Sequence, residues 1–214
     1  MNSIQRNTGI ISAITIIALT LTFLVTIIVF PLIDFISTKD YVSNYKASSL
    51  IPVIPSFLLT LANIPLFIVL FYYAAKKRRI FALTGIVFGA GYMITSSINY
   101  FLQLSAVNKG IVANSTEFIT PFLFYNPMSV TYAIDNLGYL FLSVSFLFFS
   151  GIFNQRGLQS WIKSFFIVTG ISGIIGCLGY LLNNSLLETL VFITAFPYLI
   201  SVALLIFEFR KKHA

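Results

Sequence analysis

The stretch from residue 64 to residue 86, IPLFIVLFYYAAKKRRIFALTGI, decides the fold because it places four consecutive cations between two apolar runs. Each apolar run belongs to a segment of roughly 20 residues or more, the length that an α-helix needs to cross the hydrocarbon core of a bilayer. The charges of Lys76–Arg79 cannot enter hydrocarbon without a large cost. They therefore mark a short connection between two membrane helices.

The composition of the chain excludes an ordinary soluble domain. The 214 residues are 58% hydrophobic and only 9% charged, whereas soluble domains carry about 25% charged residues. So few charges cannot cover a water-exposed surface, so lipid must surround most of the molecule. The net charge of +7 comes from basic residues at the ends of apolar runs. We therefore expect membrane lipids as partners and no nucleic acid.

Six stretches have the length and hydrophobicity of membrane helices. Their apolar character is continuous, whereas the strands of an outer-membrane barrel alternate polar and apolar residues. The first run is also too long for a signal-peptide core, and no cleavage site follows it. We predict one all-α domain over residues 1–214, a polytopic membrane helix bundle with six transmembrane helices. The predicted spans are about 10–36, 51–75, 80–105, 129–153, 161–182 and 187–208.

The positive charges predict the orientation of the bundle. With the N-terminus in the cytoplasm, ten of the thirteen lysines and arginines face the cytoplasm, as the positive-inside rule requires. The exceptions are Lys39, Lys46 and Lys109. Five of the six acids, including Asp34 and Glu188, then fall in the outer half. Both termini are expected to be cytoplasmic. Residue usage rich in Ile, Asn and Lys predicts a multi-pass protein of the bacterial inner (plasma) membrane.

Glycines and prolines inside the spans predict how the helices pack. Small side chains let helix backbones approach closely, and proline removes a helix hydrogen bond and can kink the helix. The glycines at helical spacing are Gly85, Gly89, Gly170, Gly173, Gly176 and Gly179, and the prolines are Pro31, Pro65 and Pro197.

The outer connection at about 106–128 is long and aromatic, with Phe118, Phe122, Phe124 and Tyr125 beside a single acid, Glu117. Such a segment is too apolar to extend freely into water. It is expected either to lie at the membrane interface as an aromatic-rich helix or to fold over the mouth of the bundle.

Polar side chains gather in the outer halves of the third and fourth spans. Tyr92, Ser96, Asn99 and Gln103 are spaced by four, three and four residues, which puts them on one helix face. A carboxylate inside a bilayer costs several kcal/mol unless it meets water or partners, so Asp135 should point into the bundle. The hypothesis is an outward-facing polar pocket. Its candidate ligand-binding residues are Asn99, Tyr100, Gln103, Asn126, Asp135, Asn136 and Tyr139.

The same residues also have a structural interpretation. Amide side chains such as Asn99 and Gln103 can tie membrane helices together, each contributing about 0.6–2 kcal/mol. Asp135 is only about two turns into its predicted helix, where the helix dipole favours a negative charge. Both interpretations stay open on the sequence alone.

The sequence lacks the residues that several kinds of site need. The only histidine, His213, lies in the C-terminal tail, and the only cysteine, Cys177, lies in an apolar run. We therefore predict no metal site, no cofactor and no disulfide within the chain. No motif identifies catalytic residues.

Three segments carry a resemblance to known sequences: Asn99-Tyr100-Phe101-Leu102-Gln103, Tyr125-Asn126-Pro127 and Asp135-Asn136-Leu137-Gly138-Tyr139. This part of the chain, about residues 95–150, resembles a group of uncharacterised bacterial six-span integral membrane proteins. The group has no established activity, so the resemblance implies only a small bacterial multi-span protein.

Three classes of function follow. The first is binding or transport of a small or amphiphilic molecule through the polar pocket. The second is a membrane-embedded enzyme on a lipid or isoprenoid substrate, with Asp135 as acid or base and a second catalytic group within reach. The third is a structural or accessory membrane subunit without a ligand. The oligomeric state is left open.

Overall fold

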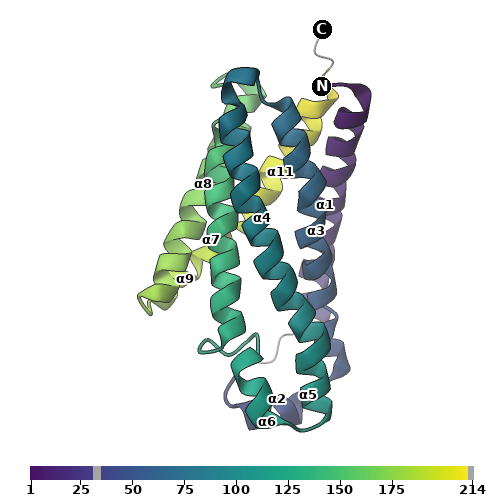
Figure 1. The fold of residues 1–214 in the computed structure, drawn as a ribbon, viewed down its shortest axis with the longest axis vertical. Coiled ribbons are helices and arrows are strands. Elements are labelled where there is room, and N and C mark those ends of the chain that lie inside the picture. Colours follow the sequence, from purple (N-terminus) through teal and green to yellow (C-terminus); the bar gives the residue numbers. More distant parts are fainter. Residues whose placement is uncertain (31–34, 212–214) are drawn as a thin grey trace.

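The computed structural model describes residues 1–30 and 35–211, and this part of the chain folds as an elongated all-α bundle (Figure 1). Within it, six helical stretches are long and apolar enough to cross a membrane. The prediction of a six-helix membrane bundle is therefore confirmed at the level of helix number and composition. The expectations for Pro31, Asp34 and His213 fall on positions outside the described residues.

The long helices follow the predicted spans closely. α1 begins before the predicted residue 10, because the Asn2 side chain accepts a hydrogen bond from the Gln5 N–H and the Gln5 side chain accepts one from the Asn2 N–H. This reciprocal capping box starts the helix among polar residues. The long helices are α1 (Ser3–Val29), α3 (Val53–Tyr73), α4 (Arg79–Leu102), α7 (Val130–Ser150), α8 (Gly157–Leu181) and α11 (Ala195–Arg210).

The sixth span is broken rather than continuous. It consists of the short helices α9 (Ser185–Glu188) and α10 (Leu190–Ile193) followed by α11. Pro197 lies in the first turn of α11 and has no N–H to donate to the carbonyl four residues earlier. The start of α11 is the position at which a helix tolerates this loss.

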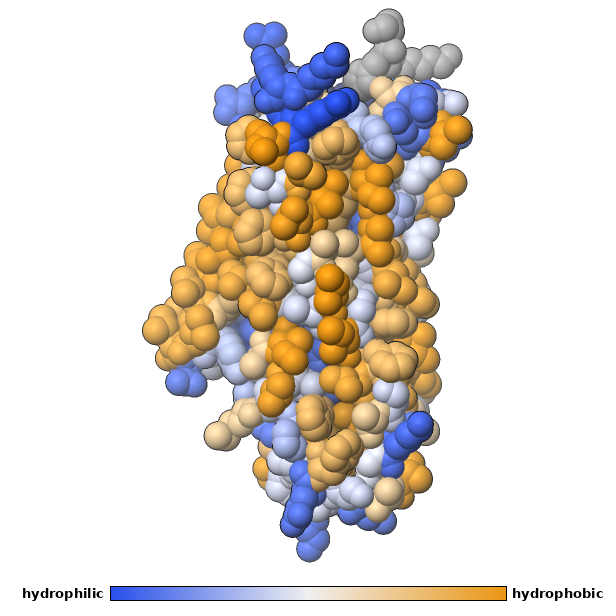
Figure 2. Space-filling view, in the orientation of Figure 1, coloured by the Kyte–Doolittle hydropathy of each residue, from blue (hydrophilic) through white to orange (hydrophobic). Residues whose placement is uncertain are grey.

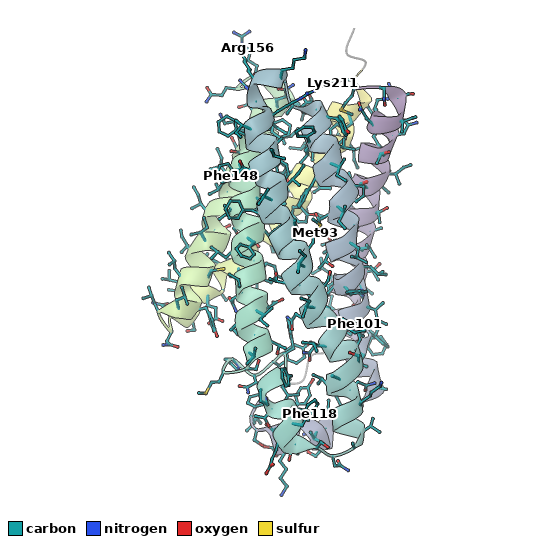
Figure 3. All side chains as sticks on the ribbon, in the orientation of Figure 1. Met93, Phe101, Phe118, Phe148, Arg156 and Lys211 are labelled. Atoms are coloured by element: carbon teal, nitrogen blue, oxygen red, sulfur yellow. The ribbon has the colours of Figure 1, made fainter. Side chains whose placement is uncertain are left out.

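The helices alternate in direction, so the two ends of the bundle differ in charge. α3 ends and α4 begins at one end, joined by the short helix η2 (Lys76–Arg78). The side chains of Arg156 and Lys211 lie at this same end, and Phe118 lies at the opposite one (Figure 3). We call the end that carries η2, Arg156 and Lys211 the basic end. Figure 2 shows hydrophilic side chains gathered there above a broad hydrophobic band.

Aromatic side chains fill the centre of the bundle. The Phe67 and Phe149 rings lie 5.0 Å apart, and the Phe146 and Phe166 rings lie 4.9 Å apart, between centroids. These four phenylalanines come from α3, α7 and α8 and are almost completely buried. On the outside, by contrast, large apolar side chains such as Ile28 are exposed. An apolar interior with an apolar exterior is the arrangement of a bundle surrounded by lipid.

The glycines of α8 permit close helix contacts, as predicted. A Cβ atom added to Gly176 would lie 2.6 Å from the backbone nitrogen of Val191, and one added to Gly179 would lie 2.6 Å from the Leu187 carbonyl carbon. Such distances are too short for real Cβ contacts. Only glycine therefore lets α9 and α10 pack directly on the α8 backbone.

The end opposite the basic end is closed by a cap of short helices. The cap comprises α2 (Thr38–Asn44), α5 (Asn108–Val112), α6 (Thr116–Ile119) and η4 (Thr120–Phe122), and the π-helical turn η3 (Gln103–Val107) joins it to α4. It has a small hydrophobic core of its own, made by Tyr41, Val107, Ile111, Ile119 and Leu123. Of the two arrangements expected for residues 106–128, the structure has the segment folded over the end of the bundle.

Candidate functional site

The polar face of α4 meets the first turns of α7 inside the bundle. Asn99 is 0% exposed and Asp135 is 8% exposed. The Asn99 Nδ2 group donates a hydrogen bond to Asp135 Oδ1 at 3.2 Å. The helical spacing on α4 and the position of Asp135 near the start of α7 therefore bring the two central residues of the predicted pocket into direct contact.

Two oxygen atoms in this region are buried without a hydrogen-bond partner among the described residues. They are Asn99 Oδ1 and Ser96 Oγ. Ser96 is completely buried one turn before Asn99, and a Cβ atom on Gly138 would lie 2.7 Å from its hydroxyl oxygen. An unsatisfied buried polar atom costs about 1–3 kcal/mol. Buried groups of this kind are rare in native proteins and frequently mark functional positions.

Tyrosines surround the Asp135 carboxyl group. The hydroxyls of Tyr92, Tyr100 and Tyr139 lie close enough to interact with it electrostatically. Tyr100 and Tyr139 also hydrogen-bond to each other, and the Tyr92 and Tyr139 rings lie 6.4 Å apart. We call Ser96, Asn99, Asp135 and these three tyrosines the polar cluster. It combines one carboxyl, one amide and several hydroxyls within an apolar bundle.

Gln103 connects the cap to α4 rather than joining the polar cluster. Its Nε2 group donates to the Phe122 carbonyl at 2.8 Å, and its Oε1 accepts from the Phe124 N–H at 3.4 Å. The π-helical turn begins at Gln103, and such turns widen the helix and re-aim side chains. Both ends of the amide are thus used by the cap backbone.

Asn126 and Asn136, also predicted to line the pocket, bond mainly to nearby backbone. Asn126 Nδ2 donates to the Thr120 carbonyl at 3.3 Å, and Asn126 Oδ1 accepts from the Met128 N–H at 3.0 Å. Asn136 Nδ2 donates to the Tyr132 carbonyl at 3.0 Å. These contacts shape the turn before α7 and the α7 surface.

The tyrosines of the cap sit in a dry environment. Burial is the largest cause that raises the pKa of Tyr41 well above the ordinary value for tyrosine, with a smaller contribution from neighbouring Tyr45. Burial also raises the pKa of Tyr125, which Tyr41 raises further. The rings of Tyr41 and Tyr125 lie 6.3 Å apart. These two aromatic side chains are therefore packed away from solvent.

The sequence did not indicate a second polar network at the basic end. Glu208 is 0% exposed and accepts hydrogen bonds from Tyr73 Oη at 2.6 Å and from Gln159 Nε2 at 2.8 Å on one oxygen. Lys211 Nζ lies 2.6 Å from its other oxygen. The only available signal was that Glu208 is the single acid expected on the positively charged side.

Glu188 likewise has a partner that its sequence position did not reveal. Glu188, expected at the outer boundary, accepts a hydrogen bond from the Tyr132 hydroxyl. The Tyr132 ring packs at 5.5 Å from that of Tyr180. The contact joins α7 to α9 beside the end of α8.

The described residues contain no group of three or more His, Cys, Asp or Glu side chains that could hold a metal ion. Cys177 is buried, and its Sγ donates to the Asn136 carbonyl at 3.2 Å. Comparisons of the chain with protein-family models, curated proteins and solved structures found no match.

Proposed function

We propose that this integral membrane protein binds a small or amphiphilic molecule at the polar cluster between α4 and α7, and that it holds the molecule there or passes it across the membrane. The observation that carries the proposal is the buried Asn99 Oδ1 atom, which has no hydrogen-bond partner in the described part of the chain although Asn99 Nδ2 bonds to Asp135. A donor group on a ligand would satisfy this oxygen. The bound state would then recover the free energy that the unpaired atom costs.

The surroundings of the cluster favour a molecule with both polar and apolar parts. Asp135 accepts hydrogen bonds when ionised, and the phenols of Tyr100 and Tyr139 offer donors, acceptors and ring faces. Beyond the cluster the core of the bundle is packed with phenylalanine and aliphatic side chains. A polar head at Asp135 with an apolar tail along the helices fits this distribution, as is common for binding sites with a few polar groups in an apolar wall.

Two variants and one control test this proposal. Asn99→Leu removes the unpaired oxygen, and Asp135→Asn removes the carboxylate while keeping its shape. The control is Ser145→Ala, because Ser145 is also fully buried in α7 but its hydroxyl bonds to the Gly85 carbonyl at 2.6 Å. Native mass spectrometry of the purified protein should show a co-purified molecule that both cluster variants lose and the control retains.

The proposal would be overturned if the wild-type protein carried no molecule besides annular lipid in several expression hosts. It would also be overturned if the cluster variants retained the bound molecule at wild-type occupancy. Measuring the thermal unfolding midpoint of every variant separates loss of ligand from loss of fold.

A structural or accessory subunit without a ligand is the second candidate. It is favoured by the way in which Gln103, Asn126 and Asn136 bond to nearby backbone groups. It predicts that the cluster variants change stability and nothing else. An enzyme on a lipid or isoprenoid substrate would need a second acid or base near Asp135, and the ionisable groups that interact with it there are tyrosines and Cys177.

A further inference from the structure

A pocket of about 450 Å³ lies at the basic end, far from the polar cluster. Its wall is built from the end of α3, the short helix η2, the connection after α7 and the first turn of α8. Its lining includes Tyr73, Lys77, Arg78, Asn154 and Gln159. We call it the basic pocket. Its volume lies in the range of ordinary small-molecule sites, about 300–1,000 Å³.

The charged side chains that line the basic pocket are all cations. Lys77 and Arg78 line it, and none of the lining residues is acidic. Glu208 binds two of the lining side chains, Tyr73 and Gln159, but Lys211 pairs with it at 2.6 Å and offsets its charge. The pocket is therefore positively charged although a buried carboxylate lies next to it.

Three of the lining side chains, those of Tyr73, Arg78 and Gln159, are held by hydrogen bonds within the protein. Gln159 Nε2 donates to Glu208 and to the Tyr73 hydroxyl, at 2.8 and 2.7 Å, and Gln159 Oε1 accepts from the Asn154 N–H at 3.0 Å. Arg78 Nη1 donates to the Ile152 carbonyl at 3.2 Å. That bond fixes the guanidinium at the pocket wall while using only one of its five N–H donors.

The helix starts at this end add to the positive potential. α4 and α8 begin here, and neither has a side-chain cap hydrogen bond at its N-cap residue. Helix N-termini carry a partial positive charge and favour anions. In contrast, the flanking cation Arg79 lies over the Phe71 ring at 5.4 Å and is not part of the pocket.

We propose that the basic pocket binds a phosphate-bearing anion, either the headgroup of an anionic phospholipid or a soluble phosphate compound. A guanidinium pairs with phosphate oxygens through two parallel hydrogen bonds, and the lysine ammonium adds a point charge. The side-chain amide of Asn154 supplies a further polar group, whereas the Gln159 amide holds the pocket wall in place. The pocket lies at the basic end, where Figure 2 shows hydrophilic side chains above the hydrophobic band, the level at which lipid headgroups would lie.

The test compares two double variants with the same loss of charge in the same segment. Lys77→Gln/Arg78→Gln removes the cations of the pocket, and Lys76→Gln/Arg79→Gln removes the two cations beside it. Binding of dioctanoyl phosphatidic acid, dioctanoylglycerol and inorganic phosphate to the full chain in neutral detergent is measured by the shift of the thermal unfolding midpoint with concentration. Hydrogen bonds to charged groups are strong enough that we expect the pocket variant to bind phosphatidic acid about tenfold or more weakly, with little change in the flanking variant.

The probes also distinguish the two sources of phosphate. Binding of phosphatidic acid with much weaker binding of inorganic phosphate assigns the pocket to a lipid headgroup, and comparable binding of both assigns it to a soluble phosphate. The proposal is overturned if neither phosphate probe binds saturably, if dioctanoylglycerol binds as tightly as phosphatidic acid, or if both double variants lose affinity equally. Should the pocket double variant not fold, Lys77→Gln compared with Lys76→Gln decides the same question.

Discussion

At the scale of single residues, two fully buried serines differ in their hydrogen bonding. Ser145 Oγ donates to the Gly85 carbonyl at 2.6 Å and so joins α7 to α4. Ser96 Oγ has no partner among the described residues. Both side chains are 0% exposed. One hydroxyl therefore stabilises the bundle, and the other adds a cost that a structural role does not explain.

This contrast gives a stability prediction. Ser145→Ala should lower the free energy of unfolding by about 0.6–1 kcal/mol, the usual value of a hydrogen bond between membrane helices. Ser96→Ala should leave stability unchanged or raise it, because it removes an unsatisfied buried group. Reversible unfolding in mixed detergent measures both. A larger loss for Ser96→Ala than for Ser145→Ala would show that Ser96 has a structural partner after all.

The sequence predicted the polar residues better than it predicted their partners. Helical spacing placed Asn99 on the same face as Ser96, and the cost of a carboxylate in lipid turned Asp135 inward. The pocket hypothesis also included Gln103 and Asn126, but both bond to the backbone of the 106–128 segment. Which donor meets which acceptor depends on how the loop folds, and periodicity carries no information about that.

At the scale of elements, α8 shows how small side chains determine packing. Gly170 and Gly173 face α7, while Gly176 and Gly179 face the short helices α9 and α10. The glycine spacing visible in the sequence predicted close packing correctly. It did not predict that the element packed there would be a broken helix.

Gly176→Leu should therefore destabilise the bundle strongly, by about 1–3 kcal/mol or more as expected for overpacking. The new side chain would meet the backbone of Val191. A matched control is Val168→Leu, which adds volume on the exposed side of the same helix. Thermal unfolding with size-exclusion chromatography checks the outcome, and equal midpoints for the two variants would contradict the close contact of α8 with α10.

A second prediction at this scale concerns the attachment of the cap. Gln103→Leu leaves the Phe122 carbonyl and the Phe124 N–H without their partner. Hydrogen exchange across residues 113–124 should become faster by about tenfold, since one lost bond costs about 1 kcal/mol or more. Ser105→Ala is the control, because that hydroxyl bonds only within its own helix, to the Phe101 carbonyl. Unchanged exchange in Gln103→Leu would mean that the cap is held by its hydrophobic core alone.

The cap should also loosen at alkaline pH. Burial raises the pKa of Tyr41 and Tyr125 above the ordinary value of about 10. The stability gained from neutral phenols is thus complete below about pH 10 and is lost as the pH rises through the higher pKa of the folded state. A spin label on Ser115→Cys in a Cys177→Ala background should gain mobility above about pH 10. Tyr41→Phe should reduce that gain, and an equal response in this variant would rule out Tyr41 as the cause.

At the scale of the whole molecule, the two ends of the bundle are chemically different. One end carries Lys76–Arg79 and the buried Glu208 network, and the other is closed by the aromatic cap. The polar cluster lies nearer the cap, and the basic pocket lies at the opposite end. If the positive-inside rule holds for this chain, the cap faces outward and the basic pocket faces the cytoplasm.

Labelling of single cysteines tests this orientation. In a Cys177→Ala background, Ser115→Cys places a thiol on the cap, and Gln155→Cys places one at the basic end; both positions are exposed. A membrane-impermeant maleimide added to intact bacterial host cells should label Ser115→Cys and should label Gln155→Cys only after the cells are broken. The reverse pattern would invert the predicted topology.

The sequence by itself determined the class of the molecule. Its apolar runs match the thickness of a bilayer, and the cations between them cannot be buried in lipid, so the six helices and their connections follow from composition and length. Helical spacing also predicted that Ser96 and Asn99 share one face of their helix. These features depend on local periodicity and on the free energy of transferring side chains from water to hydrocarbon. Both can be read directly from a linear sequence.

Only the tertiary structure decided how distant segments meet. It folded residues 106–128 over the end of the bundle, left Ser96 Oγ and Asn99 Oδ1 unpaired, and assembled the basic pocket from α3, η2 and α8. It also brought Tyr73, Gln159 and Glu208 together across more than a hundred positions of sequence. Such contacts depend on the relative placement of helices in three dimensions, and the packing of side chains that fixes this placement has no short-range signature in the chain.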